Sequence, residues 1–364
     1  MPDPPFRIPH PGSRLLTVSH LTTVFDLPSG PAPAVNDVSF QVDRGETLCL
    51  VGESGSGKSV TALSILRLVD RPGRIAGGRV RFDGRELMDL DEAAMQAVRG
   101  AGISLIFQEP MTALNPVFTI GSQIAETLEV HGLARGRAAR QRAVELLAAV
   151  RMPDPGRRAG DYAHQLSGGL RQRALIAMAL ACNPPLVIAD EPTTALDMTI
   201  QAQILDLLRD LRKRFGLALI LITHDLGVVA EMADRVAVMY AGRIVEEAPV
   251  GDLFRNPQHP YTRGLLASMP GGTPGSRLQA IPGTVPPLGH LPPGCAFAPR
   301  CPNRFEPCDG ASPGMTVIRH GESGTRGVES GTRNADPAYG TPDTGHSARC
   351  YLYGGGATDA EASR

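Results

Sequence analysis

Short apolar runs, separated by glycine, proline and polar positions, divide the chain into strand-like and helix-like segments. Residues 15–51 contain several such runs and read as a strand region, whereas residues 117–181 look mainly helical. Residues 185–189 and 217–223 are apolar throughout, as expected of central parallel strands covered on both faces. A helical pattern over residues 200–215 lies between these two runs. The alternation predicts an α/β core.

The amino-acid composition of the sequence changes from about Pro249. Proline-rich loops lead into a group of cysteines, and residues 319–347 are polar, glycine-rich and poor in apolar side chains. We expect this last stretch to be a disordered insertion, because it cannot bury enough apolar surface to fold. It contains a direct repeat, Glu-Ser-Gly-Thr-Arg at 322–326 and 329–333, to which we assign no function.

Composition and charge narrow the classes of partner. The chain has 364 residues, enough for two domains, and a formal net charge of -1, so it offers no strong single-sign field to nucleic acid or anionic lipid. Its longest apolar run, residues 174–182, is far shorter than the ~20 residues that a membrane-spanning helix needs. Residues 1–14 lack an apolar signal core. We therefore expect a cytosolic chain whose membrane role, if any, comes through a partner.

Residues 52–59 fit the pattern G-x-x-x-x-G-K-[ST] at every fixed position, and they lie between a strand-like run and a helix. Glycines permit positive φ, so successive N–H groups can point at phosphate oxygens, and the helix N-terminus adds partial positive charge. The lysine can reach the β- and γ-phosphates, and the final serine hydroxyl can bind Mg²⁺. The alternative is a chance glycine-rich turn. The residues predicted to contact the nucleotide are Gly52, Ser54, Gly55, Gly57, Lys58, Ser59 and Val60.

An apolar strand ends in two adjacent carboxylates, Asp190 and Glu191. Next to a phosphate loop, the first carboxylate can hold Mg²⁺, and the second can orient and deprotonate the attacking water. Adjacent strand residues point to opposite sides, so the two acids need not duplicate each other. Taken alone, such a pair is often only a solvated strand end. The phosphate loop favours Asp190 as a magnesium ligand and Glu191 as the catalytic base.

Residues 166–173 read Leu-Ser-Gly-Gly-Leu-Arg-Gln-Arg and precede the acidic strand. Here the chain resembles the ATP-binding cassette family, whose signature is Leu-Ser-Gly-Gly, followed in many members by Gln. Leu170 replaces that Gln, as an apolar residue commonly does in the peptide-importer branch. Ser167 can cap the helix that begins here, and its hydroxyl with the N–H groups of Gly168 and Gly169 makes a second anion site. The resemblance implies that this site closes on the γ-phosphate held by another subunit, so that ATP joins a dimer.

Other landmarks of the family follow in order. Gln108 matches the glutamine loop, which in the family contacts Mg²⁺ and the attacking water and touches the membrane subunit. Asp197 and the two residues before it match the loop that communicates across the dimer. His224 matches the switch histidine, which bonds the γ-phosphate and steadies Glu191, although a lone histidine is more often structural. Phe25 is a candidate for stacking on adenine, with a core phenylalanine as the alternative.

The cassette resemblance implies an α/β P-loop NTPase fold, with a RecA-like core, an antiparallel β edge and a helical subdomain, plus a small irregular C-terminal region. We expect a tail over residues 1–14 and a nucleotide-binding domain over 15–255, with its helical subdomain at about 110–180. Residues 256–364 form the C-terminal region. The implied activity is hydrolysis of ATP with Mg²⁺, coupled to transport.

Residues 256–262, Asn-Pro-Gln-His-Pro-Tyr-Thr, look like a motif that follows the cassette in oligopeptide, dipeptide and nickel importers. Without the family they read as a turn leading into a helix. Residues 109–116 also resemble this branch. The resemblance implies two transmembrane permease subunits, an extracytoplasmic binding protein and a second ATP-binding subunit, identical or homologous, at the cytoplasmic face of the inner membrane, with no nucleic acid.

The expected function is therefore ATP-driven import of di- or oligopeptides across a bacterial inner membrane. An importer of nickel or another small solute is the alternative within the branch. A soluble ATPase of the same superfamily, acting in DNA repair, is the alternative from another class. Such proteins carry long coiled-coil or zinc insertions between phosphate loop and signature, whereas this chain has only about 110 residues there and no sustained heptad.

Six cysteines are present, of which Cys49 and Cys182 lie in apolar runs and read as small buried hydrophobes. Clustered cysteines in a cytosolic protein suggest a metal site, and four thiolates suit Zn²⁺ or an iron–sulfur cluster. No C-x-x-C pair is present, and the spacing matches neither common ferredoxin pattern. The resemblance implies a [4Fe–4S] cluster, with zinc or metal-free cysteines as alternatives. The four clustered residues are Cys295, Cys301, Cys308 and Cys350.

Overall fold

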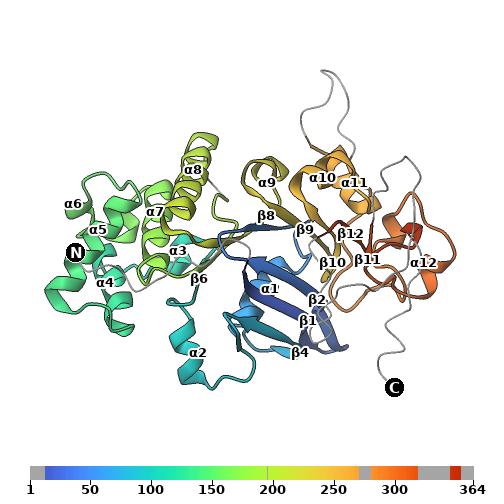
Figure 1. Cartoon of the computed structure of the whole chain (residues 1–364), viewed down its shortest axis with the longest axis horizontal. Coiled ribbons are helices and arrows are strands. Elements are labelled where there is room, and N and C mark those ends of the chain that lie inside the picture. Colours follow the sequence, from blue (N-terminus) through green and yellow to red (C-terminus); the bar gives the residue numbers. More distant parts are fainter. Residues whose placement is uncertain (1–12, 195, 270–279, 319–344, 354–364) are drawn as a thin grey trace. The chain divides into compact units, whose positions relative to one another are not determined.

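The computed structural model of the chain describes residues 13–194, 196–269, 280–318 and 345–353 (Figure 1). The chain divides into two compact units. Among the described residues, the first unit contains those up to Leu15, Val42–Thr47 and those within Leu87–Ile222. The second unit contains Leu16–Gln41, Leu48–Glu86 and the described residues from Thr223 onward.

Parallel strands form the sheet of the first unit, in the order β8-β7-β6. These strands are β6 (Ile103–Ile106), β7 (Leu186–Asp190) and β8 (Ala218–Thr223). Every residue of β7 and β8 is buried, which accounts for their unbroken apolar sequences. The prediction of two central parallel strands at these positions is confirmed.

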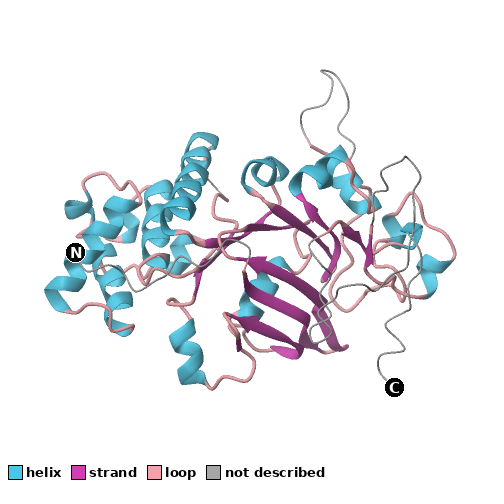
Figure 2. Ribbon diagram, viewed as in Figure 1, coloured by secondary structure: helices cyan, strands magenta, loops and turns pink. Residues whose placement is uncertain are grey.

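Helices make up most of the rest of the first unit, as the sequence predicted for residues 117–181 (Figure 2). Helices α4, α5 and α7 pack against one another. Side chains of Asp91, Thr119 and Asp197 cap α2, α4 and α8 at their N-termini. The helices are α2 (Glu92–Val98), α3 (Pro110–Ala113), α4 (Ile120–Val130), α5 (Gly136–Ala149), α6 (Pro155–Arg158), the 3-10 helix Ala163–Gln165, α7 (Gly168–Ala179) and α8 (Met198–Phe215).

An antiparallel sheet in the second unit has the strand order β2-β1-β4-β5. Its strands are β1 (Arg14–Leu27), β2 (Gly30–Asp43), β4 (Gly73–Phe82) and β5 (Arg85–Glu86). This sheet confirms the expected antiparallel β edge. The sequence did not indicate β4, because its glycines and arginines are typical of a loop. Its strand conformation is stabilised by pairing with β1 along its length.

The second sheet of this unit combines strands from residues 47–249 with strands from residues 316–348, in the order β11-β12-β10-β9-β3. Strand β3 is parallel to β9, and the other neighbours pair antiparallel. Strands β11 and β12, near the end of the chain, therefore extend a sheet whose other strands come from earlier residues. The strands are β3 (Thr47–Val51), β9 (Arg235–Tyr240), β10 (Arg243–Pro249), β11 (Thr316–Val317) and β12 (Ser347–Ala348).

The disorder expected over residues 319–347 falls, up to residue 344, outside the described residues. At its C-terminal end the expectation was wrong. Ser347 is buried in β12, and buried His346 places Nε2 2.7 Å from Oε1 of Glu246, which is also buried. These contacts order the last residues of a stretch whose composition is typical of a loop.

The helices of the second unit are short. They are α1 (Lys58–Ile65), α9 (Leu226–Met232), α10 (Val250–Arg255), α11 (Pro260–Ala267), α12 (Pro307–Gly310) and the 3-10 helices Ala298–Arg300 and Tyr351–Tyr353. Across the part of the chain that the structure describes, no helix combines the length and apolarity needed to span a membrane.

Candidate functional site

The loop between β3 and α1 has the backbone conformation that the phosphate pattern predicts. Gly52, Gly55 and Gly57 have φ angles of 154°, 79° and 101°. A Cβ atom on Gly52 would lie 2.2 Å from the carbonyl oxygen of Met239, and one on Gly57 would lie 2.6 Å from that of Ala34. Both glycines are therefore required by space as well as by conformation.

The loop lysine is folded against the loop itself. Lys58 is 5% exposed, and its Nζ donates to the carbonyl oxygens of Gly52 at 2.8 Å and Glu53 at 3.0 Å. Ser59 and Val60 begin α1 and are half-buried, while Ser54 is exposed at the tip of the loop. The second unit thus holds every predicted phosphate-loop residue in one turn and one helix N-terminus.

Sequence reasoning missed two residues that bind this loop from the C-terminal region. Tyr261 accepts a hydrogen bond at its hydroxyl from the N–H of Glu53, over 2.9 Å. Arg300 places Nη1 2.6 Å and Nη2 3.0 Å from the two carboxylate oxygens of Glu53. The available signal was the motif at 256–262, which contains Tyr261 and to which no chemistry was assigned.

The first unit brings Gln108 and Glu191 together. Gln108 donates from Nε2 to Oε2 of Glu191 over 3.0 Å, and Thr194 donates from Oγ1 to the same oxygen over 2.8 Å. Glu191 follows Asp190, the buried last residue of β7, and has a φ of 44°, which is uncommon for a residue with a side chain. The carboxylate is therefore held in one orientation just past the strand end.

The signature residues begin α7 in the first unit. Ser167 is at the N-cap position, as predicted, but its side chain accepts no capping hydrogen bond there. Gly168 is exposed and Gly169 is buried, where an added Cβ would lie 2.6 Å from Cγ2 of Ile200. Asp197 caps α8 by accepting from the N–H of Ile200 over 2.9 Å. Residue 195, two positions before Asp197, lies outside the described residues.

Two further predicted residues lie in the second unit. His224 is exposed and directly follows β8, before α9. Phe25 is half-buried in β1, where it pairs with Gly73 of β4. The predicted nucleotide residues are thus divided between the units: the phosphate loop, Phe25 and His224 belong to the second, and the others belong to the first.

The four C-terminal cysteines line one small cavity in the second unit, together with His259, Phe297, Phe305 and Tyr351. All four are free thiols. Burial raises the pKa of Cys350 to about 11 and also raises the pKa of Cys295 and Cys301. Among the described residues, no group of three or more His, Cys, Asp or Glu side chains is arranged so that it could hold a metal ion. The cavity therefore gathers the four predicted thiols, and no metal site is formed among the described residues.

The other two cysteines do not line this cavity. Cys49 is fully buried in β3, and burial raises its pKa. Cys182 is half-buried, and burial raises its pKa to about 11. The interpretation of Cys49 as a small core hydrophobe is confirmed.

Two families match the chain. The ABC transporter family matches residues 35–194, and the C-terminal region of oligopeptide/dipeptide transporters matches residues 245–308. A peptide import ATP-binding protein of Brucella melitensis is 56% identical over 317 residues, covering 84% of this chain and 94% of that protein. The oligopeptide transport ATP-binding protein AppD of Bacillus subtilis is 51% identical over 315 residues, covering 85% and 95%. The dipeptide transport ATP-binding protein DppD of the same organism is 51% identical over 306 residues, covering 84% and 91%.

Solved structures agree with this relationship. A dimeric ATP-binding cassette in a post-hydrolysis state, bound to ADP and phosphate, has a TM-score of 0.59 at 30% identity and covers 65% of this chain and 99% of its own. A subunit of an ABC transporter complex from Clostridium perfringens has a TM-score of 0.57 at 25% identity, covering 67% and 91%. The predicted cassette fold is confirmed. The chain therefore belongs to the ATPase subunits of ABC transporters, in the branch that carries the oligopeptide/dipeptide transporter C-terminal region.

Proposed function

We infer that this chain hydrolyses ATP to power the import of di- or oligopeptides across a bacterial inner membrane. The main support for this inference is that one chain combines a cassette with the oligopeptide/dipeptide transporter C-terminal region. Relatives that are 51% identical and bear both oligopeptide and dipeptide transport names favour a peptide cargo over nickel.

In the proposed mechanism, the phosphate loop binds the β- and γ-phosphates through its N–H groups and Lys58. Ser59, Asp190 and Gln108 would hold Mg²⁺, and the ion would supply positive charge to the phosphates when bound. Glu191 deprotonates the attacking water, and its orientation by Gln108 and Thr194 supports that role, because a general base must be held at the reacting atoms. His224 bonds the γ-phosphate, and Phe25 stacks on adenine. These roles are the ones that the family gives to the matching residues.

A second ATP-binding subunit completes each site in this proposal. Ser167, Gly168 and Gly169 bind the γ-phosphate held by the other subunit, and Asp197 contributes to communication across the dimer. Ser167 is exposed at the N-terminus of α7, a position suited to contacts with phosphate, which supports this role. The dimeric state of the similar cassette bound to ADP and phosphate also supports this arrangement.

The remaining partners are two transmembrane permease subunits, with an extracytoplasmic binding protein that delivers the peptide. In this proposal the chain acts at the cytoplasmic face of the inner membrane through the permeases, which the peptide import and transport ATP-binding names of its relatives support. We propose that residues 15–255 form the nucleotide-binding domain, with a helical subdomain at about 110–180, and that residues 256–364 form the C-terminal region.

We also propose that the four cysteines hold a [4Fe–4S] cluster. The convergence of four thiols on one cavity supports this, since such a cluster takes four thiolate ligands. A single zinc ion needs sulfur atoms about 2.3 Å from one point, so its ligands crowd closer than those of a cluster of eight atoms. When bound, the cluster would link loops that have few apolar residues, and its binding energy would become local folding energy.

The test is reconstitution of the full chain with its permease subunits and second ATPase subunit in lipid vesicles. We expect ATP hydrolysis that is stimulated by binding protein with peptide, and peptide uptake that requires ATP. Glu191→Gln is the matched inactive control. ATP hydrolysis that responds to DNA, with no peptide uptake, would favour the repair ATPase instead; uptake of nickel without peptide would favour the other importer class.

A further inference from the structure

Glu53, the second residue of the phosphate loop, is held at three separate places. Its N–H donates to the Tyr261 hydroxyl over 2.9 Å, and its carbonyl oxygen accepts from Nζ of Lys58 over 3.0 Å. Its two carboxylate oxygens accept from Arg300 over 2.6 and 3.0 Å. Two of these three attachments come from the C-terminal region, and the third comes from the loop's own lysine. Backbone and side chain of the loop are therefore both fixed from outside the loop.

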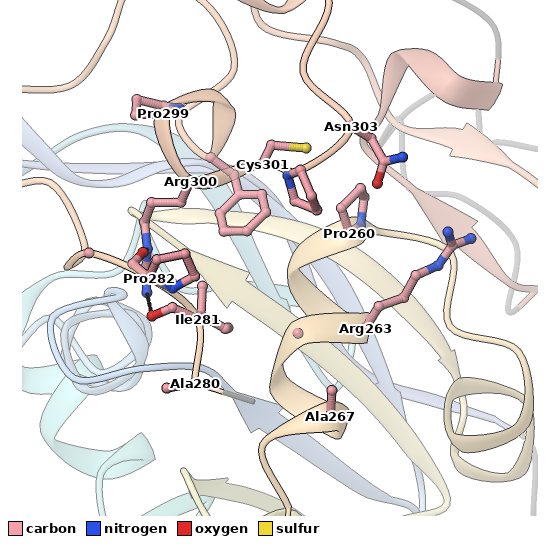
Figure 3. Close-up of a pocket in the computed structure, with 14 residues that line it drawn as sticks. Pro260, Arg263, Ala267, Ala280, Ile281, Pro282, Pro299, Arg300, Cys301 and Asn303 are labelled. Atoms are coloured by element: carbon pink, nitrogen blue, oxygen red, sulfur yellow. Dashed lines mark hydrogen bonds between the residues drawn. The ribbon is translucent and has the colours of Figure 1, made fainter. Parts of the chain in front are cut away.

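The Arg300 side chain is buried and is held in place by several hydrogen bonds. Its side chain is 5% exposed, and its Nε donates to the carbonyl oxygen of Pro282 over 2.8 Å. Figure 3 shows the side chain turned toward Pro282 and Ile281, away from the neighbouring Cys301. Nη1 also lies 3.4 Å from the Tyr240 hydroxyl. A buried guanidinium with a two-pronged carboxylate partner is among the stronger polar contacts in proteins, and it has a single geometry.

Tyr261 is equally constrained. It is fully buried and packs edge-on against Tyr240, with ring centroids 4.7 Å apart. Its own N–H donates to Nδ1 of His259 over 3.1 Å, and the N–H of His259 donates to buried Glu246 over 2.8 Å. The motif at 256–262 thus fixes the tyrosine to β10, and the tyrosine fixes the loop.

We propose that Arg300 and Tyr261 are positioning residues for nucleotide binding, through which the C-terminal region sets the affinity of the phosphate loop for ATP. This inference rests on the proposed function of the loop in binding ATP. A phosphate loop binds through N–H groups that are already aimed at the anion, so loosening Glu53 weakens binding. The Glu53 carboxylate is occupied by Arg300 and takes no part in the chemical step. Loss of these contacts to Glu53 should therefore raise the KM for ATP and leave kcat nearly unchanged.

The experiment compares Arg300→Gln with Arg304→Gln in the full chain assembled with its permease subunits. Arg304 is the matched control, because it lies four residues away and pairs with Asp309 at the surface, both side chains being about half exposed. We expect Arg300→Gln to raise the KM for ATP by about tenfold, the size of a lost charged hydrogen bond, with kcat within about twofold. Arg304→Gln should change neither value. Binding of a fluorescent ADP analogue should weaken in parallel with the KM.

Two further variants separate positioning from general stability. Tyr261→Phe keeps the packing and removes the hydroxyl, so it should raise the KM with little change in unfolding temperature. Glu53→Gln combined with Arg300→Gln should be no worse than either alone, because both remove one contact. Arg300→Lys should restore only part of the affinity, since an ammonium lacks the two-pronged geometry.

An unchanged KM in Arg300→Gln and in Tyr261→Phe, beside an active wild-type transporter, would overturn the inference. A wild-type transporter that binds ATP and does not hydrolyse it would instead overturn the proposed function, and ADP affinity would still test the positioning role. If Arg300→Gln fails to fold, Tyr261→Phe decides the matter by itself.

Discussion

Gln108 donates a hydrogen bond from its side-chain nitrogen to Oε2 of Glu191 over 3.0 Å, across 83 positions of sequence. The same carboxylate oxygen accepts from Thr194, so two neutral donors from different segments hold one acid in place. The arrangement suits a general base whose carboxylate must point in a single direction.

Glu191→Gln should retain ATP binding and lose nearly all turnover. The amide keeps the shape of the side chain and cannot accept a proton, so kcat should fall by about a hundredfold or more. The variant should also form a more stable ATP-bound dimer, because hydrolysis no longer reopens it. Steady-state phosphate release, nucleotide binding and gel filtration with ATP measure the three effects. Glu145→Gln, which alters an exposed ion pair on α5, serves as the control. Turnover near the wild-type value would remove Glu191 from the mechanism.

Ser167→Arg should block hydrolysis in the site of the partner subunit and spare the site of its own chain. Mixing it with Lys58→Ala chains gives a dimer with one doubly damaged site and one intact site, so part of the activity should return. ATPase rates of each variant alone and of the mixture provide the measurement. Each variant mixed with wild type shows whether a single intact site is sufficient. If one intact site is sufficient and the two-variant mixture still shows no recovery, the trans arrangement is wrong.

Anaerobically purified protein should be brown and contain iron and acid-labile sulfide. Single Cys→Ser changes at the cavity-lining positions Cys295, Cys301 or Cys308 should bleach it, because each removes one ligand. Cys49→Ser is the control, since Cys49 is buried in β3. If the protein is colourless and contains stoichiometric zinc, the site binds zinc and not an iron–sulfur cluster. If it contains neither metal after expression in iron-rich medium, both assignments are wrong.

Glu247→Ala should destabilise the second unit strongly. Arg235 donates from Nε to Oε1 of Glu247 over 2.9 Å, and the two side chains are only 7% and 8% exposed. Removing one partner leaves the other charge buried, at a cost of about 3–5 kcal/mol in the free energy of unfolding. The unfolding temperature of the full chain should fall by roughly 5 °C or more. Glu145→Ala removes a half-exposed partner of Arg142 and should cost no more than about 0.5 kcal/mol. Equal effects of the two changes would contradict the burial argument.

Secondary structure was predictable where burial alone dictated the residues. Strands β7 and β8 are buried at every position and read as unbroken apolar runs. Strand β4 has no such signature, because several of its positions are exposed and its order comes from pairing with β1. The end of the expected disordered stretch was misjudged for the same reason: His346 and Ser347 are ordered by β10, which lies about 100 positions earlier in the chain.

The sequence by itself determined which local segments are predicted to carry the nucleotide chemistry. Residues 52–59, residues 166–173 and the pair Asp190 and Glu191 are local patterns, in which spacing along the chain sets the backbone that a phosphate or a metal ion requires. Only the tertiary structure decided that Arg300 binds Glu53 across 247 positions, and that four cysteines with irregular spacing line one cavity. Such pairings follow from how sheets and loops pack, and packing depends on contacts between segments that no local spacing records.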